Sequence, residues 1–261
     1  MQSPASDQVL TGGTLCTPEG IRSASWLRIS RGRIAEIGEG DPPAGQRIDA
    51  RDCWVVPGFI DIHCHGGGGF SFIEEDLDAV RAAAAAHARH GTTTMLASLV
   101  SRPVAELAAQ VSALRELVDD GVFAGIHLEG PFLSAARCGA HDPALLRPPD
   151  PASVQALLAA GRGALRMLTL APELPGATAA IRQLTDAGVL AAIGHTDAAY
   201  EQVLPAIEAG ATVATHLFNG MRPLHHRTPG PIAALLADER VSIELICDLV
   251  HLHSAVARLA A

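Results

Sequence analysis

Residues 57–69 read PGFIDIHCHGGGG, an apolar run that ends in two histidines and four glycines. Side chains alternate along a β-strand, so His63 and His65 point to the same side, about 6–7 Å apart, and Cys64 points to the other. From residue 53 onward, apolar β-rich runs alternate with segments rich in Ala and Leu. Continuous apolar strands separated by helices indicate a parallel sheet covered on both faces.

The number of repeats predicts a (β/α)₈ barrel of the TIM type. The expected strands are 54–62, 92–100, 122–129, 165–171, 189–195, 211–217 and 241–247. The expected helices are 76–90, 103–119, 151–161, 177–187, 198–209 and 230–238. Only a helix-like piece follows the seventh strand, so we expect the eighth strand to be missing from this chain. Before residue 53 the pattern is one of short β segments, with a hairpin signal at Arg31-Gly32.

The bulk composition limits the classes of protein to consider. The chain has 261 residues, of which 48% are hydrophobic, enough for one large domain with or without a small satellite. A net charge of −9 argues against a nucleic-acid-binding surface. No apolar run approaches the roughly 18 residues of a membrane span, and the N-terminus lacks the features of a signal peptide. Dispersed cysteines without a paired motif fit a reducing cytoplasm; they are Cys16, Cys53, Cys64, Cys138 and Cys247.

Polar residues concentrate where the predicted strands end, which in a barrel is the face that carries active sites. They are His63, His65, His127, Glu129, Glu173, His195, His216, Asn219, Asp248 and His251. A lone pair of histidines could be hydrogen-bonded core residues. With further His and Glu on later strand ends, we interpret His63 and His65 as metal ligands.

Glu129 ends the third strand, in GIHLEGPF, and has no cation near it in the sequence. An unpaired buried carboxylate is costly, and a metal would relieve that cost. Together with His195 and His216 it forms a set of two histidines and one glutamate. Three such ligands with an open position are what a catalytic zinc-type site uses to bind and acidify a water.

Two loops add candidate substrate contacts. The stretch NGMRPLHHRTPG, residues 219–230, holds the densest positive cluster, which is either a solvated loop or an anion clamp. In the second case Arg227 could hold a phosphate in bidentate fashion, with Asn219 and the Gly220 backbone as further donors. The stretch CGAHDP, residues 138–143, lies on a long loop after the third strand, of the kind that often forms a lid, and its His141 is a candidate to polarise a carbonyl. Cys138 in the same loop is interpreted as filler rather than a redox-sensitive thiol.

At these motifs the chain resembles the N-acetylglucosamine-6-phosphate deacetylase family of the amidohydrolase superfamily. The matching stretches occur in family order: PGFIDIHCHGGGG, HLEGPF, GAHDP, LAPE, GHTDA, THLFNGM, HRTPG and DLVHLH. The resemblance implies a metal-dependent barrel with a small β-sandwich. On this basis we expect residues 1–52 to be the β-sandwich portion and residues 53–261 to be the hydrolase barrel. It also implies hydrolysis of the sugar phosphate to glucosamine 6-phosphate and acetate, in amino-sugar catabolism.

The resemblance assigns roles position by position. Glu129, His195 and His216 match the primary metal ligands, and His63 and His65 match a second-metal pair found in some members. His141 matches the residue that contacts the substrate carbonyl. The matched substrate-binding positions are Ala140, His141, Asn219, Gly220, Arg227, Asp248 and His251. The expected cofactor is a divalent metal, one or two per subunit, with zinc favoured and iron, cobalt or manganese as alternatives. The expected assembly is a homodimer.

Three features bear on the branch of the superfamily. The chain has no Lys, so it cannot bridge two metals with a carboxylated lysine as hydantoinase-like relatives do. Leu249 stands where family members commonly have Gly, which places local substrate contacts in question. The family's catalytic aspartate follows the eighth strand, so we expect this chain to be a fragment of a longer parent with little activity alone. The alternatives are a metal- and sugar-phosphate-binding fragment without activity, and an amidohydrolase for another N-acyl substrate.

Overall fold

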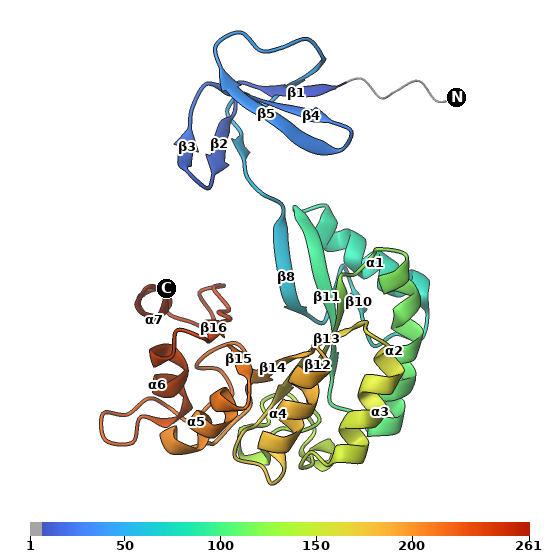
Figure 1. The fold of residues 1–261 in the computed structure, drawn as a ribbon, viewed down its shortest axis with the longest axis vertical. Helices are drawn as coiled ribbons and strands as arrows, with labels where there is room; N and C mark the ends of the chain where they lie inside the picture. The colour runs from blue at the N-terminus through green and yellow to red at the C-terminus, as the bar shows by residue number, and fades with distance from the viewer. Residues whose placement is uncertain (1–6) are drawn as a thin grey trace. The chain divides into compact units, whose positions relative to one another are not determined.

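A computed structural model describes residues 7–261 of the chain. Its internal contacts divide the chain into two units, one up to Phe59 and one from Ile60 to Ala261 (Figure 1). No helix in the described part of the chain has both the length and the apolar character needed to cross a membrane.

Every regular element in the described part of the first unit, from residue 7 onward, is a strand. The strands are β1 (Gln8–Thr11), β2 (Thr14–Thr17), β3 (Gly20–Arg22), β4 (Ser25–Ser30), β5 (Arg33–Glu39), β6 (Gln46–Asp49) and β7 (Trp54–Val55). They form a four-stranded sheet in the order β5-β4-β1-β6 and a three-stranded sheet in the order β3-β2-β7.

Two features of this unit follow from local sequence. Arg31 and Gly32 both have positive φ, 52° and 72°, which suits a two-residue hairpin turn between β4 and β5. The predicted hairpin is thereby confirmed. Trp54 and Val55 pair with β2, and internal contacts divide the chain after Phe59. The division at residue 52 that the sequence suggested stays a prediction. The assignment of this unit to a β-sandwich stays a prediction.

The second unit contains a seven-stranded sheet. Its strands are β8 (Phe59–Cys64), β11 (Thr92–Val100), β12 (Gly125–Glu129), β13 (Leu165–Leu170), β14 (Leu190–Ile193), β15 (Ala211–Ala214) and β16 (Ser242–Ile243). A short hairpin, β9 (Gly66–Gly67) and β10 (Phe70–Ser71), follows β8. The strand order β16-β15-β14-β13-β12-β11-β8 matches chain order, and each pair from β11 to β16 runs parallel. This order, with a helix between most successive strands, is that of a TIM-type barrel wall, as the sequence predicted.

The helices cover one face of this sheet. They are α1 (Leu77–Ala88), α2 (Val104–Asp119), α3 (Pro151–Gly161), α4 (Ala177–Asp186), α5 (Tyr200–Glu208), α6 (Gly230–Ala237) and α7 (Ser254–Ala260). Two short 3₁₀ helices, η1 (Ala135–Arg137) and η2 (Pro143–Leu145), lie in the loop after β12. The start of α3 shows why these boundaries could be read from the sequence. Asp150 caps it by accepting from the Ser153 N–H at 2.9 Å, and Pro151 follows at the first helical position.

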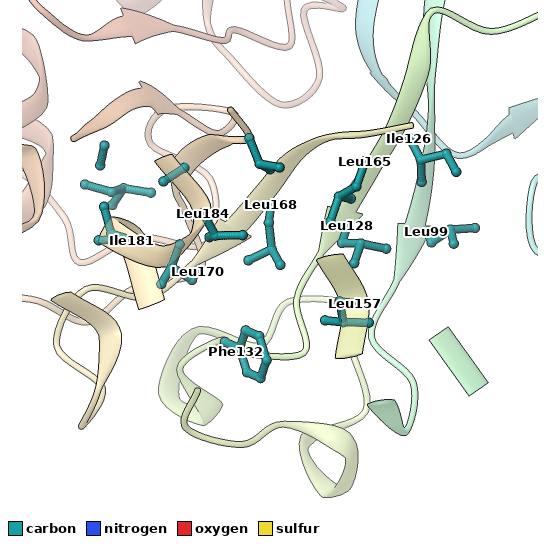
Figure 2. Packing of buried hydrophobic residues seen from close by; sticks show 14 of the residues in the cluster. Leu99, Ile126, Leu128, Phe132, Leu157, Leu165, Leu168, Leu170, Ile181 and Leu184 are labelled. Atoms are coloured by element: carbon teal, nitrogen blue, oxygen red, sulfur yellow. The ribbon is translucent and has the colours of Figure 1, made fainter. Parts of the chain in front are cut away.

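Successive side chains along each strand point alternately toward the helices and toward the barrel interior. Outward side chains such as Leu99, Leu128 and Leu168 pack with apolar residues of the helices, including Leu157 of α3 and Leu184 of α4 (Figure 2). A separate inner cluster consists of Leu96, Met167, Ala192 and Val213. The strands therefore carry an apolar face toward the helices and present their other face to the barrel interior.

A polar layer in the interior accounts for His127. Its Nδ1 lies 2.9 Å from Ser98 Oγ and its Nε2 lies 2.8 Å from Thr169 Oγ1, which in turn lies 2.8 Å from Thr215 Oγ1. Complete burial, together with the charge of nearby His63, lowers the pKa of His127 well below the ordinary value. His127 is thus a neutral core residue whose two ring nitrogens already have hydroxyl partners.

Candidate metal centre

The carboxylate of Glu129 is the centre of the polar cluster at the end of the barrel strands. Glu129 is the last residue of β12 and is 4% exposed. Its Oε1 lies 3.0 Å from His195 Nε2 and 2.9 Å from His216 Nε2. Its Oε2 faces His65 Nε2 at 3.0 Å and His63 Nε2 at 3.5 Å. One carboxylate therefore joins both predicted histidine pairs, with one oxygen directed to each.

The backbone at His195 and His216 adopts an unusual conformation. Their φ angles are 45° and 30°, in the left-handed region that most L-residues avoid. This turn ends β14 at Ile193 and β15 at Ala214, short of the predicted ends at residues 195 and 217. Strained backbone of this kind clusters at functional sites, where the surrounding structure holds it in place.

Hydrogen bonds fix which nitrogen of each ring carries its proton. His195 Nδ1 lies 2.8 Å from the Arg137 carbonyl oxygen, and His216 Nδ1 lies 3.1 Å from the Asn219 carbonyl oxygen. A carbonyl only accepts, so both Nδ1 atoms donate, and in the neutral ring Nε2 presents a lone pair. The two Nε2 atoms lie 3.1 Å apart. A cation between them would remove the repulsion of facing lone pairs, so this half of the site fits a metal.

The same logic applies to the H-x-H pair. His65 Nδ1 lies 3.1 Å from the Ser98 carbonyl oxygen, and His63 Nδ1 lies 3.1 Å from Glu244 Oε2. Both rings therefore donate through Nδ1, and their Nε2 atoms face each other at 3.1 Å. The pair thus repeats the arrangement of His195 and His216 on the other oxygen of Glu129.

His141 has the opposite orientation. Its Nδ1 accepts from the backbone N–H of Ser101 at 3.4 Å, so in the neutral ring the proton sits on Nε2. That Nε2 lies 3.3 Å from Glu129 Oε2. His141 therefore offers an N–H donor to the cavity rather than a lone pair, as a residue that binds a carbonyl oxygen would.

The charges of the site favour a cation. Burial raises the pKa of Glu129, but the surrounding imidazoles of His141, His195, His216 and His63 outweigh it, and the net pKa lies far below the ordinary range. For His63, burial lowers the pKa, but the carboxylates of Glu129 and Glu244 outweigh it and raise the value to about 10. The site therefore favours positive charge beside Glu129, either as a proton on His63 when no ion is bound or as a cation in place of that proton.

Glu244 is a member of this cluster that the sequence did not single out. Its Oε2 accepts from the backbone N–H of His216 at 3.2 Å as well as from His63. Its Oε1 is buried and has no hydrogen-bond partner among residues 7–261. The only sequence signal was its position within the predicted strand 241–247.

A cavity of about 880 Å³ opens over these side chains. Besides Glu129 and the five histidines around it, its wall includes Ala140, Asp142, Glu244 and an apolar group at the sheet edges: Ile60, Ile62, Ile243, Leu245 and Ile246. Arg102 is the one permanently cationic side chain on this wall among the described residues, and none of their carboxylates lies within ion-pair distance of it. The sequence did not single out Arg102 either.

Several predicted substrate contacts lie off this wall. Asn219 and Gly220 contact two of the candidate ligands instead: the Asn219 carbonyl oxygen accepts from His216, and the Gly220 backbone closely approaches the His195 ring. Asp248 and His251 are exposed and bond each other at 2.7 Å, and Arg227 is also exposed. The predicted roles of these five residues in substrate binding stay predictions.

A second group of possible ligands, Asp61, Cys64 and His87, has a structural explanation. His87 Nε2 lies 2.9 Å from the Gly66 carbonyl oxygen and therefore donates there. A side chain at Gly67 would collide with the same ring nitrogen. His87 thus holds the glycine loop after β8, and its lone pair does not face the other two side chains.

The fold and the site define a class of protein. The sequence profile described as the amidohydrolase family matches residues 54–259, so the chain belongs to that family. It is 49% identical, with a TM-score of 0.94, to a mutant N-acetyl-D-glucosamine-6-phosphate deacetylase from Mycobacterium smegmatis in complex with N-acetyl-D-glucosamine-6-phosphate. That match covers 98% of this chain and 67% of the other.

Two curated relatives carry related names. N-acetylgalactosamine-6-phosphate deacetylase from Escherichia coli O157:H7 is 36% identical over 95% of this chain and 66% of its own length. N-acetylglucosamine-6-phosphate deacetylase from Lysinibacillus sphaericus is 32% identical over 90% of this chain and 62% of its own length. The chain thus spans slightly less than two thirds of these relatives.

Proposed function

We propose that this chain carries the metal centre of an N-acetylglucosamine-6-phosphate deacetylase, a hydrolase that cleaves the amide C–N bond of the sugar phosphate. The observation that supports it best is the division of the five imidazoles around Glu129. Four present Nε2 lone pairs in two pairs, and His141 presents an N–H donor beside them. The relatives named above support the choice of reaction and substrate class.

In this proposal Glu129, His195 and His216 would hold the primary divalent ion, and His63 and His65, together with Glu129, would hold a second. Histidine and carboxylate ligands fit zinc, with iron, cobalt and manganese as alternatives. The bound cation would supply Lewis acidity that polarises a carbonyl and acidifies a water.

The protein's own groups perform the remaining tasks. His141 Nε2–H donates to the acetamido carbonyl oxygen, where negative charge grows as water adds to the carbonyl carbon. The carbonyls of Arg137 and Asn219 keep His195 and His216 in the tautomer that a ligand needs. The C–N bond then breaks as the proton lost by the attacking water passes to the sugar nitrogen, so acetate and the free amine leave; the resemblance assigns this proton transfer to the aspartate that follows the eighth strand. Ala140 lines the cavity beside His141, which supports its predicted role in substrate binding.

The family resemblance also supports substrate roles for Asn219, Gly220, Arg227, Asp248 and His251, and a homodimeric assembly. The dispersed cysteines support a cytoplasmic location. These parts of the proposal rest on resemblance and composition rather than on the geometry of the metal centre.

The test measures acetate release from N-acetylglucosamine 6-phosphate by zinc-loaded protein, both for this chain and for a form extended through the expected eighth strand, with His141→Leu in the extended form as the decisive variant. Removing one donor to a developing oxyanion lowers kcat by roughly 10²–10³-fold, while zinc binding stays unchanged. Equal turnover of the variant would contradict the role of His141. Tight binding of zinc and sugar phosphate without any acetate release would instead indicate a binding module.

A second candidate substrate is N-acetylgalactosamine 6-phosphate, because the Escherichia coli O157:H7 relative is named for it. The two sugars differ only in the orientation of one hydroxyl. Comparing kcat/KM for both, with the same zinc-loaded protein, decides between them.

A further inference from the structure

An ion-pair cluster outside the metal centre joins three loops at the end of the barrel strands. Asp197 lies two residues after His195. Its Oδ1 accepts hydrogen bonds from both Nε and Nη2 of Arg137 at 2.8 Å. Its Oδ2 receives Arg222 Nη2 at 2.7 Å. Arg137 belongs to the loop after β12, and Arg222 belongs to the loop after β15. Asp197 therefore ties both neighbouring loops to the loop after β14.

The backbone that carries Asp197 is fixed by hydrogen bonds to Glu173 and to the adjacent loop. Glu173 Oε1 accepts from the Asp197 backbone N–H at 2.7 Å, and Glu173 Oε2 accepts from Thr196 Oγ1 at 2.5 Å. The Thr196 backbone pairs with Gly220 and Arg222 across the adjacent loop. The carboxylate thus projects from a backbone that is fixed on both sides.

Arg137 has a second contact with the same segment. Its carbonyl oxygen is the acceptor for His195 Nδ1, and three residues earlier the Ser134 N–H donates to the His195 carbonyl at 2.9 Å. The loop after β12 is thereby attached to residues 195–197 at three points, of which the Arg137–Asp197 ion pair is the one made by two side chains. The same loop continues directly to Ala140 and His141.

We propose that Asp197 is a positioning residue: through Arg137 it fixes the carbonyl that orients His195 and the loop that presents His141. The proposal rests on the proposed function in that it takes His195 as a metal ligand. Its structural content, the orientation of the His195 ring by the Arg137 carbonyl, does not depend on the reaction.

The cluster offers an internal comparison. Arg137 and Arg222 both pair with Asp197 and are similarly exposed, at 33% and 37% of their side chains. Of the two, only Arg137 also accepts a hydrogen bond from the His195 ring, through its backbone carbonyl. Removing the Arg137 guanidinium frees that carbonyl to move, whereas removing the Arg222 guanidinium leaves the Arg137 attachment intact. The Asp238–Arg240 pair, with the same two-nitrogen contact on the surface, provides a matched control outside the site.

The experiment measures Zn²⁺ affinity by competition with a chromophoric chelator, on the unsubstituted protein and on Asp197→Asn, Arg137→Gln, Arg222→Gln and Asp238→Asn. Loss of a partner behind a metal-binding histidine lowers affinity by about 10- to 100-fold. We expect a loss near tenfold for Asp197→Asn and Arg137→Gln, and little change for Arg222→Gln and Asp238→Asn. Circular dichroism and Tm confirm that each variant is folded.

A second readout needs no metal. Long-range ¹H–¹⁵N correlation spectra of the metal-free protein report which ring nitrogen of His195 is protonated. The unsubstituted protein and Arg222→Gln should show the Nδ1–H form, and Arg137→Gln and Asp197→Asn should gain the Nε2–H form. Unchanged zinc affinity and an unchanged tautomer in both of these variants would overturn the proposal. So would an equal loss in Arg222→Gln, because that indicates a general charge effect. If acetate release fails even in the form extended through the expected eighth strand while the tautomer still shifts, the proposed reaction is wrong and the positioning role stands.

Discussion

Replacing Glu244 by Gln tests whether the H-x-H pair binds an ion of its own. The carboxylate contacts His63 Nδ1 at 3.1 Å through Oε2, and that oxygen also accepts from the His216 backbone. Glutamine keeps an oxygen for these donors and removes the negative charge. Loss of a carboxylate behind a ligating histidine costs 10- to 100-fold in metal affinity. Because glutamine has the same shape as glutamate, we expect a loss of metal affinity at the low end of this range, about tenfold or about 1.4 kcal/mol.

The assay is a zinc titration against a chelator that resolves two binding events. The weaker event should weaken by about tenfold, while the stronger event, assigned to Glu129, His195 and His216, should change little. Glu208→Gln is a matched control, since Glu208 pairs with Arg240 on an exposed surface. If the weaker event is unchanged in Glu244→Gln, or if both events weaken equally, the assignment of the second ion to the H-x-H pair is wrong.

Three further predictions concern other parts of the chain. Replacing His63 and His65 together by Ala should reduce the zinc content per chain from two to one, as measured by mass spectrometry of metals; a content of two would exclude them as ligands. Arg227 and Arg102, the cationic side chain on the cavity wall, are the two candidate phosphate contacts, and Arg227→Gln and Arg102→Gln test them separately. Loss of the residue that binds the phosphate should raise KM for the sugar phosphate by about tenfold or more, whereas loss of the other should leave KM unchanged. Arg240 holds the pKa of the Asp238 carboxyl at about 2, so the stabilisation from this pair is present above the ordinary carboxyl pKa and is lost as the pH falls toward 2. The Tm of Asp238→Asn should therefore lie slightly below that of the unsubstituted protein at pH 7 and should equal it at pH 2. A difference in Tm that persists at pH 2 would contradict this role of the ion pair.

The sequence predicted the strand order and the grouping of the candidate ligands because both depend on local patterns. Apolar runs of strand length alternate with capped helices, and chemistry-bearing side chains stand where each run ends. In a parallel barrel those ends share one face, so Glu129, His195 and His216 could be grouped without knowing a single distance. The predicted helices agree with the observed ones to within two residues at either end.

What the sequence did not predict depends on contacts between loops. Glu244 is one of 28 acidic residues, and nothing local separates it from a surface carboxylate. The pairing of Asp197 with Arg137 joins residues 60 positions apart. The tautomer of His141 is decided by the backbone N–H of Ser101, which only the fold brings to it. Leu249 shows the converse: its φ of 65° suits the Gly that the family commonly has there.

The absence of lysine gives the geometry of Glu129 its significance. A bridge between two ions needs an anion with two oxygens that face in different directions, and all 19 basic side chains of this chain are Arg. A carboxylated lysine is thus excluded by composition. Glu129 directs Oε1 to His195 and His216 and Oε2 to the H-x-H pair. A carboxylate with oxygens divided in this way can bridge two ions, and its burial excludes the water that would otherwise compete for them. The composition and the side-chain geometry therefore support the same proposal, in which one glutamate replaces the modified lysine of other amidohydrolases.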